Sequence, residues 1–322
     1  MTPRKVRDIV RTFFVLLAGV LRVLMRICLR AGTVTIALLA LGGLTASALR
    51  ASTVPEFVDL ARGADIVVLG EVHDNPAHHR NQAEIVAALR PAALVFEMVP
   101  QDDEEKVNAL RASGASREAI EAALEWEESG WPDFGLYWPI LAAAPRAQVF
   151  GAQQPSAEVR RAVLEGAAGA FGPDAANYGL DQPLPPAEQR LREAEQRRAH
   201  CDALPDEMLA GMVEAQRFRD AGLADAAIWA RTMTGGGQVV VITGSGHADK
   251  LRGMPALVNY AQPGLRIVTL GQFEDDPDNA GDYDALMLAP SPARADPCAA
   301  LRERAEARAH AGQESRTPLP RP

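Results

Sequence analysis

The chain has 322 residues, of which 48% are hydrophobic and 23% are charged, and its formal net charge is −9. These values are ordinary for a globular protein with a substantial core, and the acidic balance argues against nucleic acid as a partner. The three cysteines form neither a CxxC nor a CxxCH motif, so neither a zinc ribbon nor covalently attached haem is indicated.

Residues 1–48 differ from the rest of the chain, because they hold seven basic residues, one acid and two apolar runs. The second run, 33–44, follows Arg26 and Arg30 and precedes Ala-Ser-Ala at 46–48. This order is typical of a secretory signal with its cleavage site. We therefore expect a signal peptide or an uncleaved N-terminal anchor, with the folded part outside the cytoplasm. Without this segment the net charge is −15, which argues further against nucleic acid and against anionic lipid.

Short apolar runs bounded by turn residues predict six strands that alternate with helical segments. The runs are unbroken, as in strands that are buried on both faces of a parallel sheet. The sequence thus predicts an α/β fold with a mostly parallel sheet flanked by helices. The expected strands are Asp65–Leu69, Ala92–Val99, Ala147–Gly151, Gln238–Thr243, Leu265–Leu270 and Asp284–Leu288.

Residues 155–234 show no strand pattern, and we expect a helical insertion there that forms a smaller second domain. The whole α/β domain is expected to span 54–289. The Pro-, Ala- and Arg-rich residues 290–322 are predicted to be a disordered tail. Cys201 and Cys298 could pair in an oxidising compartment, and the sequence leaves this open. The other expected helices cover 54–64, 77–89 and the polar stretch 102–126.

Two Gly-x-x-His units each follow a predicted buried strand, Gly70-Glu-Val-His73 after the first and Gly244-Ser-Gly-His247 after the fourth. Because ligands bind beyond the carboxyl ends of parallel strands, both histidines should reach one edge of the sheet. Glu71 lies inside the first unit, and Glu97 lies near the end of the second strand. We expect these four side chains to form one polar site.

Several kinds of chemistry fit this set. Two imidazoles and two carboxylates suit a Zn, Mn or Fe site, and they equally suit a general acid–base pair for hydrolysis. In a purely structural alternative, Glu97 pairs with an arginine and the histidines bond backbone carbonyls. His78 and His79, in the first turn of the next helix, are further candidates as neutral ligands or acceptors. Full dinucleotide-binding and Gly-x-Ser-x-Gly motifs are absent from the sequence.

An aromatic cluster between Trp126 and Trp138 suits a large flat ligand, and Tyr137 is the tyrosine best placed there. A phenolate oxygen is a hard donor that favours ferric haem iron. The alternative is that the cluster is only the packed face of an amphipathic helix.

Together these motifs resemble the ChaN-type haem-binding uptake proteins, a branch of a superfamily that includes the TraB/Tiki proteins and the erythromycin esterases. The resemblance runs from about 60 to 270. It rests on Leu69-Gly-Glu-Val-His-Asp-Asn-Pro76, His78-His79 with Gln82, Phe96-Glu97-Met98, Tyr137-x-Pro139, His200-Cys201, Ala215-Gln216 with Arg219-Asp220, and Gly244-Ser-Gly-His247.

The resemblance implies an exported protein, periplasmic or membrane-attached on the periplasmic side, that binds haem for iron uptake. It also implies a homodimer that brackets two haems, and delivery to or from a haem-uptake receptor. Tyr137 would be the axial ligand of the iron. The candidates for bonding propionates or an axial water would be His73, His247, His78 and His79, with Glu71 and Glu97 orienting them. The family is often lipid-anchored, and this sequence shows no lipobox.

The alternative function is a metal-dependent peptidase or esterase. In that case His73, Glu97 and His247 would hold a Mn, Co or Zn ion, and Glu71 would activate water.

Overall fold

The computed structural model describes residues 52–274, 281–296, 298, 299 and 301–303. Contacts divide the chain into Met1–Ala48 and Leu49–Pro322. The first unit, on which the predicted signal or anchor falls, lies outside the described residues. Among the residues that are described, no helix combines the length and the apolar character needed to cross a membrane.

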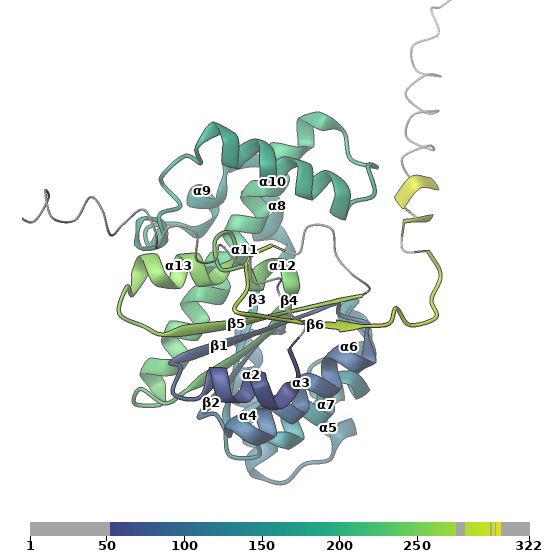
Figure 1. Cartoon of the computed structure of the whole chain (residues 1–322), viewed down its shortest axis with the longest axis vertical. Helices are drawn as coiled ribbons and strands as arrows, with labels where there is room; N and C mark the ends of the chain where they lie inside the picture. The colour runs from purple at the N-terminus through teal and green to yellow at the C-terminus, as the bar shows by residue number, and fades with distance from the viewer. Residues whose placement is uncertain (1–51, 275–280, 297, 300, 304–322) are drawn as a thin grey trace, which may run out of the picture. The chain divides into compact units, whose positions relative to one another are not determined.

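The sheet has six strands, all parallel, in the order β3-β2-β4-β1-β5-β6 (Figure 1). The predicted α/β class is confirmed, and each predicted strand is present. The fifth strand runs four residues further than expected because its last residues pair with β6. The strands are β1 (Ile66–Glu71), β2 (Ala93–Pro100), β3 (Gln148–Gln153), β4 (Val239–Gly244), β5 (Ile267–Glu274) and β6 (Ala285–Ala289).

Alternate side chains of each strand enter two separate cores, one on each face of the sheet. Val67 and Leu69 of β1 belong to one core, and Ile66 and Val68 belong to the other. This is the period of two that a strand imposes. The first core is covered by α2 (Val54–Ala61), α3 (Pro76–Leu89), α4 (Glu104–Ala112), α5 (Arg117–Ala123), α6 (Trp126–Ser129) and α7 (Phe134–Ala143), which lie below the sheet in Figure 1.

The stretch 102–126, expected to be helical, is divided into η2 (Gln101–Asp103), α4, α5 and the start of α6. The break between α4 and α5 lies at Gly114, whose φ of +72° is left-handed and incompatible with a continuous helix. The backbone N–H of Ala119 then donates to Ser116 Oγ, which caps the start of α5. Short helices therefore replace one long helix.

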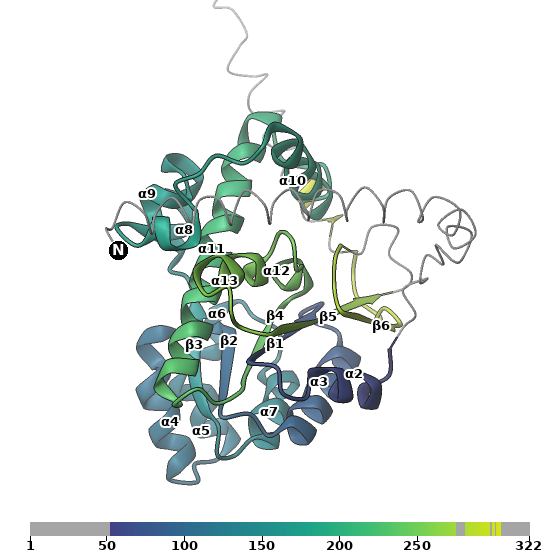
Figure 2. The ribbon, with the colours of Figure 1, turned by 60° about the vertical axis from the view of Figure 1, so that its left-hand side comes forward.

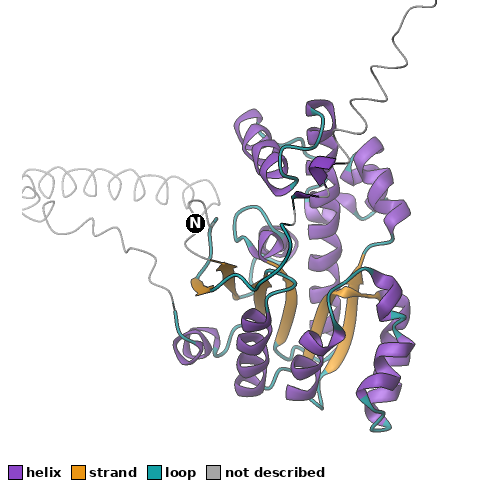
Figure 3. Cartoon of the chain, turned by 90° about the vertical axis from the view of Figure 1, so that its right-hand side faces the viewer, coloured by secondary structure: helices purple, strands orange, loops and turns teal. Residues whose placement is uncertain are grey.

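The opposite face of the sheet is covered by the helical segment that was expected at 155–234, together with α13 (Met254–Ala261). Its long helix α11 runs from the other helices of the segment down along the sheet (Figure 2). Leu223 and Ala227 of α11 share a core with Val95 and Phe150, so α11 joins the insertion to the sheet. The other elements are α8 (Ser156–Glu165), α9 (Ala167–Phe171), η3 (Ala175–Tyr178), α10 (Pro186–Ala199), α11 (Asp206–Met233) and α12 (Ser245–Ala248). Figure 3 shows the single sheet among these helices.

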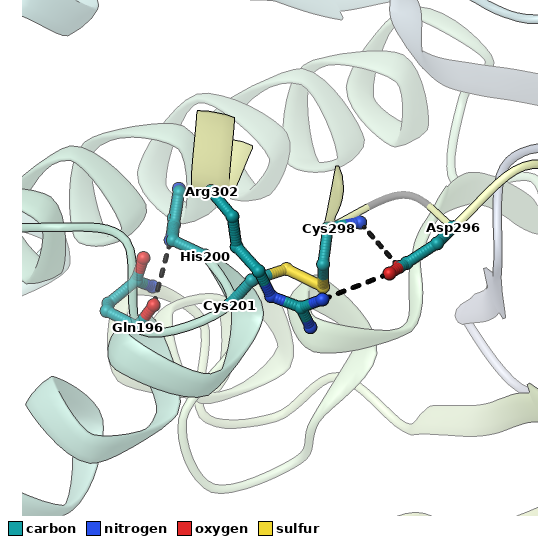
Figure 4. The surroundings of a disulfide bond; sticks show 6 residues. All are labelled: Gln196, His200, Cys201, Asp296, Cys298 and Arg302. Atoms are coloured by element: carbon teal, nitrogen blue, oxygen red, sulfur yellow. Dashed lines mark hydrogen bonds and ion pairs between the residues drawn. A yellow bond between two sulfur atoms is a disulfide. The ribbon is translucent and has the colours of Figure 1, made fainter. Parts of the chain in front are cut away.

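The first residues of the segment predicted to be a disordered tail contact the domain. Arg294 makes ion pairs with both Glu274 and Asp74, and the Pro290 carbonyl accepts a hydrogen bond from the Asn75 side chain. A disulfide then joins Cys298 to Cys201, in the connection after α10, with a Cα–Cα distance of 5.5 Å (Figure 4). Residues 304–322 of the predicted tail lie outside the described residues.

The packing of β3 against β2 gives a prediction at Gly151. A Cβ atom there would lie 2.5 Å from the carbonyl oxygens of Val99 and Pro100, so Gly151→Ala forces two backbone segments apart. We expect a loss of about 1–3 kcal/mol in the free energy of unfolding, measured with urea. Gly264→Ala is the matched control, because nothing lies within 4 Å of its Cβ position. Equal stability of the two variants would contradict this account of the packing.

Candidate functional site

The end of β1 places Glu71 in a buried cluster on the α3 and α7 side of the sheet. Its Oε1 lies 2.8 Å from Nδ1 of His73 and accepts a hydrogen bond of 3.0 Å from the hydroxyl of Tyr137. Its Oε2 lies 3.6 Å from Nδ1 of His79. Oε1 therefore orients side chains from the β1 loop and α7, whereas Oε2 and His79 Nδ1 have no hydrogen-bond partner among the described residues.

His73 is the most accessible group of this cluster, with 32% of its side chain exposed. Burial alone would lower its pKa, but the hydrogen bond and the charge of Glu71 outweigh burial and raise the pKa. With the Nδ1 proton directed at Glu71, a neutral ring keeps its lone pair on Nε2. Its Nε2 atom makes no hydrogen bond with the described residues, and it would lie 3.0 Å from a Cβ atom at Gly244. The missing side chain at 244 thus leaves space beside this nitrogen.

The end of β2 places Glu97 in a second buried cluster, on the α11 side of the sheet. Its Oε2 accepts hydrogen bonds from the Thr243 hydroxyl at 2.6 Å and the Gly244 N–H at 2.8 Å. Its Oε1 lies 3.5 Å from Nε2 of His247, whose Nδ1 lies 2.7 Å from Asp220 Oδ1. One imidazole is therefore held between two buried carboxylates.

The charges in this second cluster stabilise one another. Burial would lower the pKa of His247, but Glu97 and Asp220 outweigh it and raise the pKa to about 10. Burial would likewise raise the pKa of Glu97, but the charge and hydrogen bond of His247 hold it far below the ordinary value. The pKa of Asp220 stays raised because desolvation exceeds the effect of His247. We conclude that His247 is an imidazolium at neutral pH.

The four residues expected to form one polar site therefore reach the same edge of the sheet but belong to two clusters. Side chains two residues apart in a strand lie on the same face of the sheet. Glu71 therefore shares the face of Leu69, and Glu97 shares the opposite face with Val95. His73, two residues beyond β1, lies between the clusters and feels the charges of both Glu97 and His247. Asp220 and Gln216, whose side chain lies 3.0 Å from His247 Nδ1, complete the second cluster.

His78 and His79 are buried rather than presented to a ligand. The Val72 N–H donates to Nδ1 of His78 at 2.9 Å, and Nε2 of His79 lies 2.8 Å from the His73 carbonyl. Burial lowers the pKa of His78, which keeps its ring neutral. Both rings fix the loop after β1, which is one of the structural roles weighed from the sequence.

Tyr137, predicted to be the haem ligand, lies in the core with 1% of its surface exposed. Its ring contacts those of His79 and Trp126, with centroids 4.6 and 5.1 Å away. Burial and the neighbouring Glu71 carboxylate raise the pKa of the phenol, so the phenolate form is disfavoured. In this placement the oxygen is not offered to a ligand, and the prediction does not fit the geometry.

The metal alternative also lacks a suitable arrangement. Within the part of the chain that the structure describes, no group of three His, Cys, Asp or Glu side chains is placed to hold a metal ion. The proposed His73, Glu97 and His247 set is therefore not a preformed metal site.

A family model described as haem-binding uptake, Tiki superfamily, ChaN matches residues 57–258, well over half of the chain. The chain belongs to this family. The resemblance seen in the sequence motifs is thereby confirmed. No curated protein matches the chain by sequence.

One solved structure shares the fold of this ChaN-family chain, and others are more weakly similar. The structure of cofacial haem binding to ChaN of Campylobacter jejuni is similar with a TM-score of 0.56 and 20% identity, covering 72% of this chain and 90% of that one. The type III effector HopBA1 gives a TM-score of 0.44 at 13% identity, with coverage of 77% and 100%. An erythromycin esterase EreC mutant in its open conformation gives 0.39 at 13% identity, with coverage of 69% and 74%. The likeness to ChaN shows a shared fold, and the two weaker ones carry no argument.

The buried cluster around His247 gives a prediction on stability. His247→Gln leaves Glu97 and Asp220 without their cation, and we expect a loss of about 3–5 kcal/mol in the free energy of unfolding at pH 7. Because the folded pKa of about 10 exceeds the unfolded value, the contribution is complete below pH 6.5 and disappears as pH rises through 10. The difference between wild type and variant, measured by urea unfolding, should therefore shrink over this range.

The matched control is His200→Gln. His200 is half-buried, and its side chain bonds just the Gln196 carbonyl among the described residues, so its loss should cost less than about 0.5 kcal/mol at every pH. A difference for His247→Gln that stays constant up to pH 10 would contradict the assignment of an imidazolium.

Proposed function

We propose that this protein is exported, binds haem at the carboxyl edge of its sheet, and acts in haem or iron uptake. Family membership supports haem binding. The signal-like sequence before residue 49 supports export, and so does the Cys201–Cys298 disulfide, because disulfides persist in oxidising compartments. The homodimer and the uptake receptor remain predictions from the resemblance.

The observation that carries the proposal is the state of His73. A histidine that ligates iron generally donates its other ring N–H to a carboxylate or a carbonyl, which fixes the tautomer and the ring orientation. Glu71 does this for Nδ1 of His73, while Nε2 is free beside the space left by Gly244. The Trp131 ring packs against the imidazole in a T-shaped arrangement, with centroids 4.9 Å apart. The residues present therefore fit a haem, and His73 would hold its iron through Nε2.

Tyr137 takes a different role in this proposal. To reach iron it would have to leave the core, give up its bond to Glu71 and lose a proton beside that carboxylate. We infer that Tyr137 holds Glu71 in place for His73. The hydrolase alternative is not favoured, because it needs the metal set that the described residues do not form.

A hemin titration followed by visible spectroscopy tests the axial ligand. Wild type should give a saturable Soret band. His73→Ala should weaken hemin binding at least about tenfold and change the spectrum, and Glu71→Gln should weaken it about 10–100-fold. Tyr137→Phe should keep the spectrum, because the phenol only orients Glu71.

His200→Ala serves as the control for a half-buried histidine on another part of the surface. Loss of the Soret band in Tyr137→Phe, with binding retained in His73→Ala, would restore the tyrosine as ligand. A wild type without a saturable band would overturn haem binding itself.

A further inference from the structure

A cavity of about 340 Å³ opens beside Glu97, between the carboxyl edge of the sheet and the start of the helical insertion. Its apolar walls come from Trp131, Val159 and Leu223. Two arginines, Arg160 and Arg219, line it as well. Trp131 also contacts His73, so the cavity adjoins the proposed iron ligand. The cavity thus combines flat apolar surface with positive charge.

Arg219 stands out among the arginines of the described residues. The side chains of several others, such as Arg90, Arg146 and Arg160, also make neither a hydrogen bond nor an ion pair with described residues, but these side chains are exposed to water. Arg219 is half-buried and still has no partner in the part of the chain that the structure describes. A guanidinium presents five donors in a fixed fork, so leaving it partly desolvated and unpaired is costly. In an acidic protein, this arrangement indicates an anion that comes from outside.

Glu97 is the nearest acid that lines the cavity, but it is not free to serve as the counter-ion. Its Oε2 already accepts two hydrogen bonds, and its Oε1 is paired with the imidazolium of His247. Because that pairing neutralises the buried carboxylate, the net charge presented to the cavity comes from the arginines.

Trp131 supplies a second unsatisfied donor. Its Nε1 atom is buried and has no hydrogen-bond partner. Buried donors without an acceptor are uncommon in folded proteins, and each one calls for an explanation such as a missing ligand. An acceptor oxygen in the cavity would satisfy this donor together with the guanidinium groups.

We propose that Arg160 and Arg219 bind the carboxylate groups of the ligand, so that the cavity selects a planar ligand carrying two carboxylates. The inference rests on the proposed haem binding and assigns the side chains that recognise the haem propionates. Arginine pairs with carboxylates through two parallel N–H···O bonds, which fixes orientation as well as affinity. Trp131, Val159 and Leu223 then contact the apolar part of the ligand.

The test compares hemin with hemin dimethyl ester, which keeps the iron and the ring but has no free carboxylates. In the wild type, hemin should bind at least about tenfold more tightly than the ester. Arg219→Gln should lower hemin affinity about tenfold, and the double variant with Arg160→Gln should lower it to the level of the ester. Neither change should alter affinity for the ester, because the ester has no carboxylate to lose. Arg219→Lys should recover only part of the hemin affinity, since lysine keeps the charge but not the fork.

Arg146→Gln is the matched control, because Arg146 is exposed, unpaired and located before β3, at the opposite edge of the sheet. This inference would be overturned if the wild type binds hemin and the ester equally and the arginine variants bind hemin as the wild type does. The proposed function would stay intact in that case, provided that hemin binding still depends on His73. If the wild type binds neither hemin nor the ester, both proposals fail. Equal weakening of hemin and ester in the arginine variants would also overturn it, because it would point to a loss of structure.

Discussion

The carboxyl edge of the sheet depends on the compensation of buried charge around Glu97. This carboxylate lies at the end of an interior strand, where little of its surface reaches water, so it needs hydrogen-bond donors and a cation nearby. Thr243 and Gly244 of the adjacent strand supply the donors, and His247 supplies the charge. Asp220 on α11 then balances His247 from its other side. The register of β2 against β4, the turn into α12 and the position of α11 are thus tied together.

The alternation of side chains along the strands divides the chemistry at this edge. Glu71 points to the face covered by α3 and α7, and Glu97 points to the face covered by α11. One carboxylate orients the accessible ring of His73, and the other pairs with His247 in a closed, buried cluster. The two Gly-x-x-His units look equivalent in sequence, yet among the described residues the first leaves one ring nitrogen without a partner and the second does not. The second unit neutralises the wall of the cavity in which the arginines lie.

Local sequence pattern was enough to predict the fold and the edge where polar residues meet. Unbroken apolar runs identified the six strands, because strands buried on both faces of a parallel sheet leave no room for polar side chains. The alternation of side chains along a strand could also have placed Glu71 and Glu97 on opposite faces of the sheet. This needed only a comparison of each glutamate with the apolar residue two positions before it in its strand. Asp220 and Arg219 could not be assigned a role in this way, because they lie more than 100 residues from Glu97 in the sequence and meet it only in the folded chain. The burial of Tyr137 likewise follows from the packing of α7 against α3, which no local pattern contains.

The loop that carries His73 is held from several directions, which suits a site that must bind without rearranging. His79 bonds the His73 carbonyl, and Arg294 joins the next residue, Asp74, to Glu274 at the end of β5. The chain continues from Arg294 to the disulfide at Cys201, so the same segment links the β1 loop to the helical insertion. The insertion provides Arg160 and Arg219, and the β1 loop provides His73. The ion pair of Arg294 with Asp74 and the disulfide thus connect the β1 loop to the insertion through one segment. Such a connection limits their relative motion, which favours recognition of a rigid ligand.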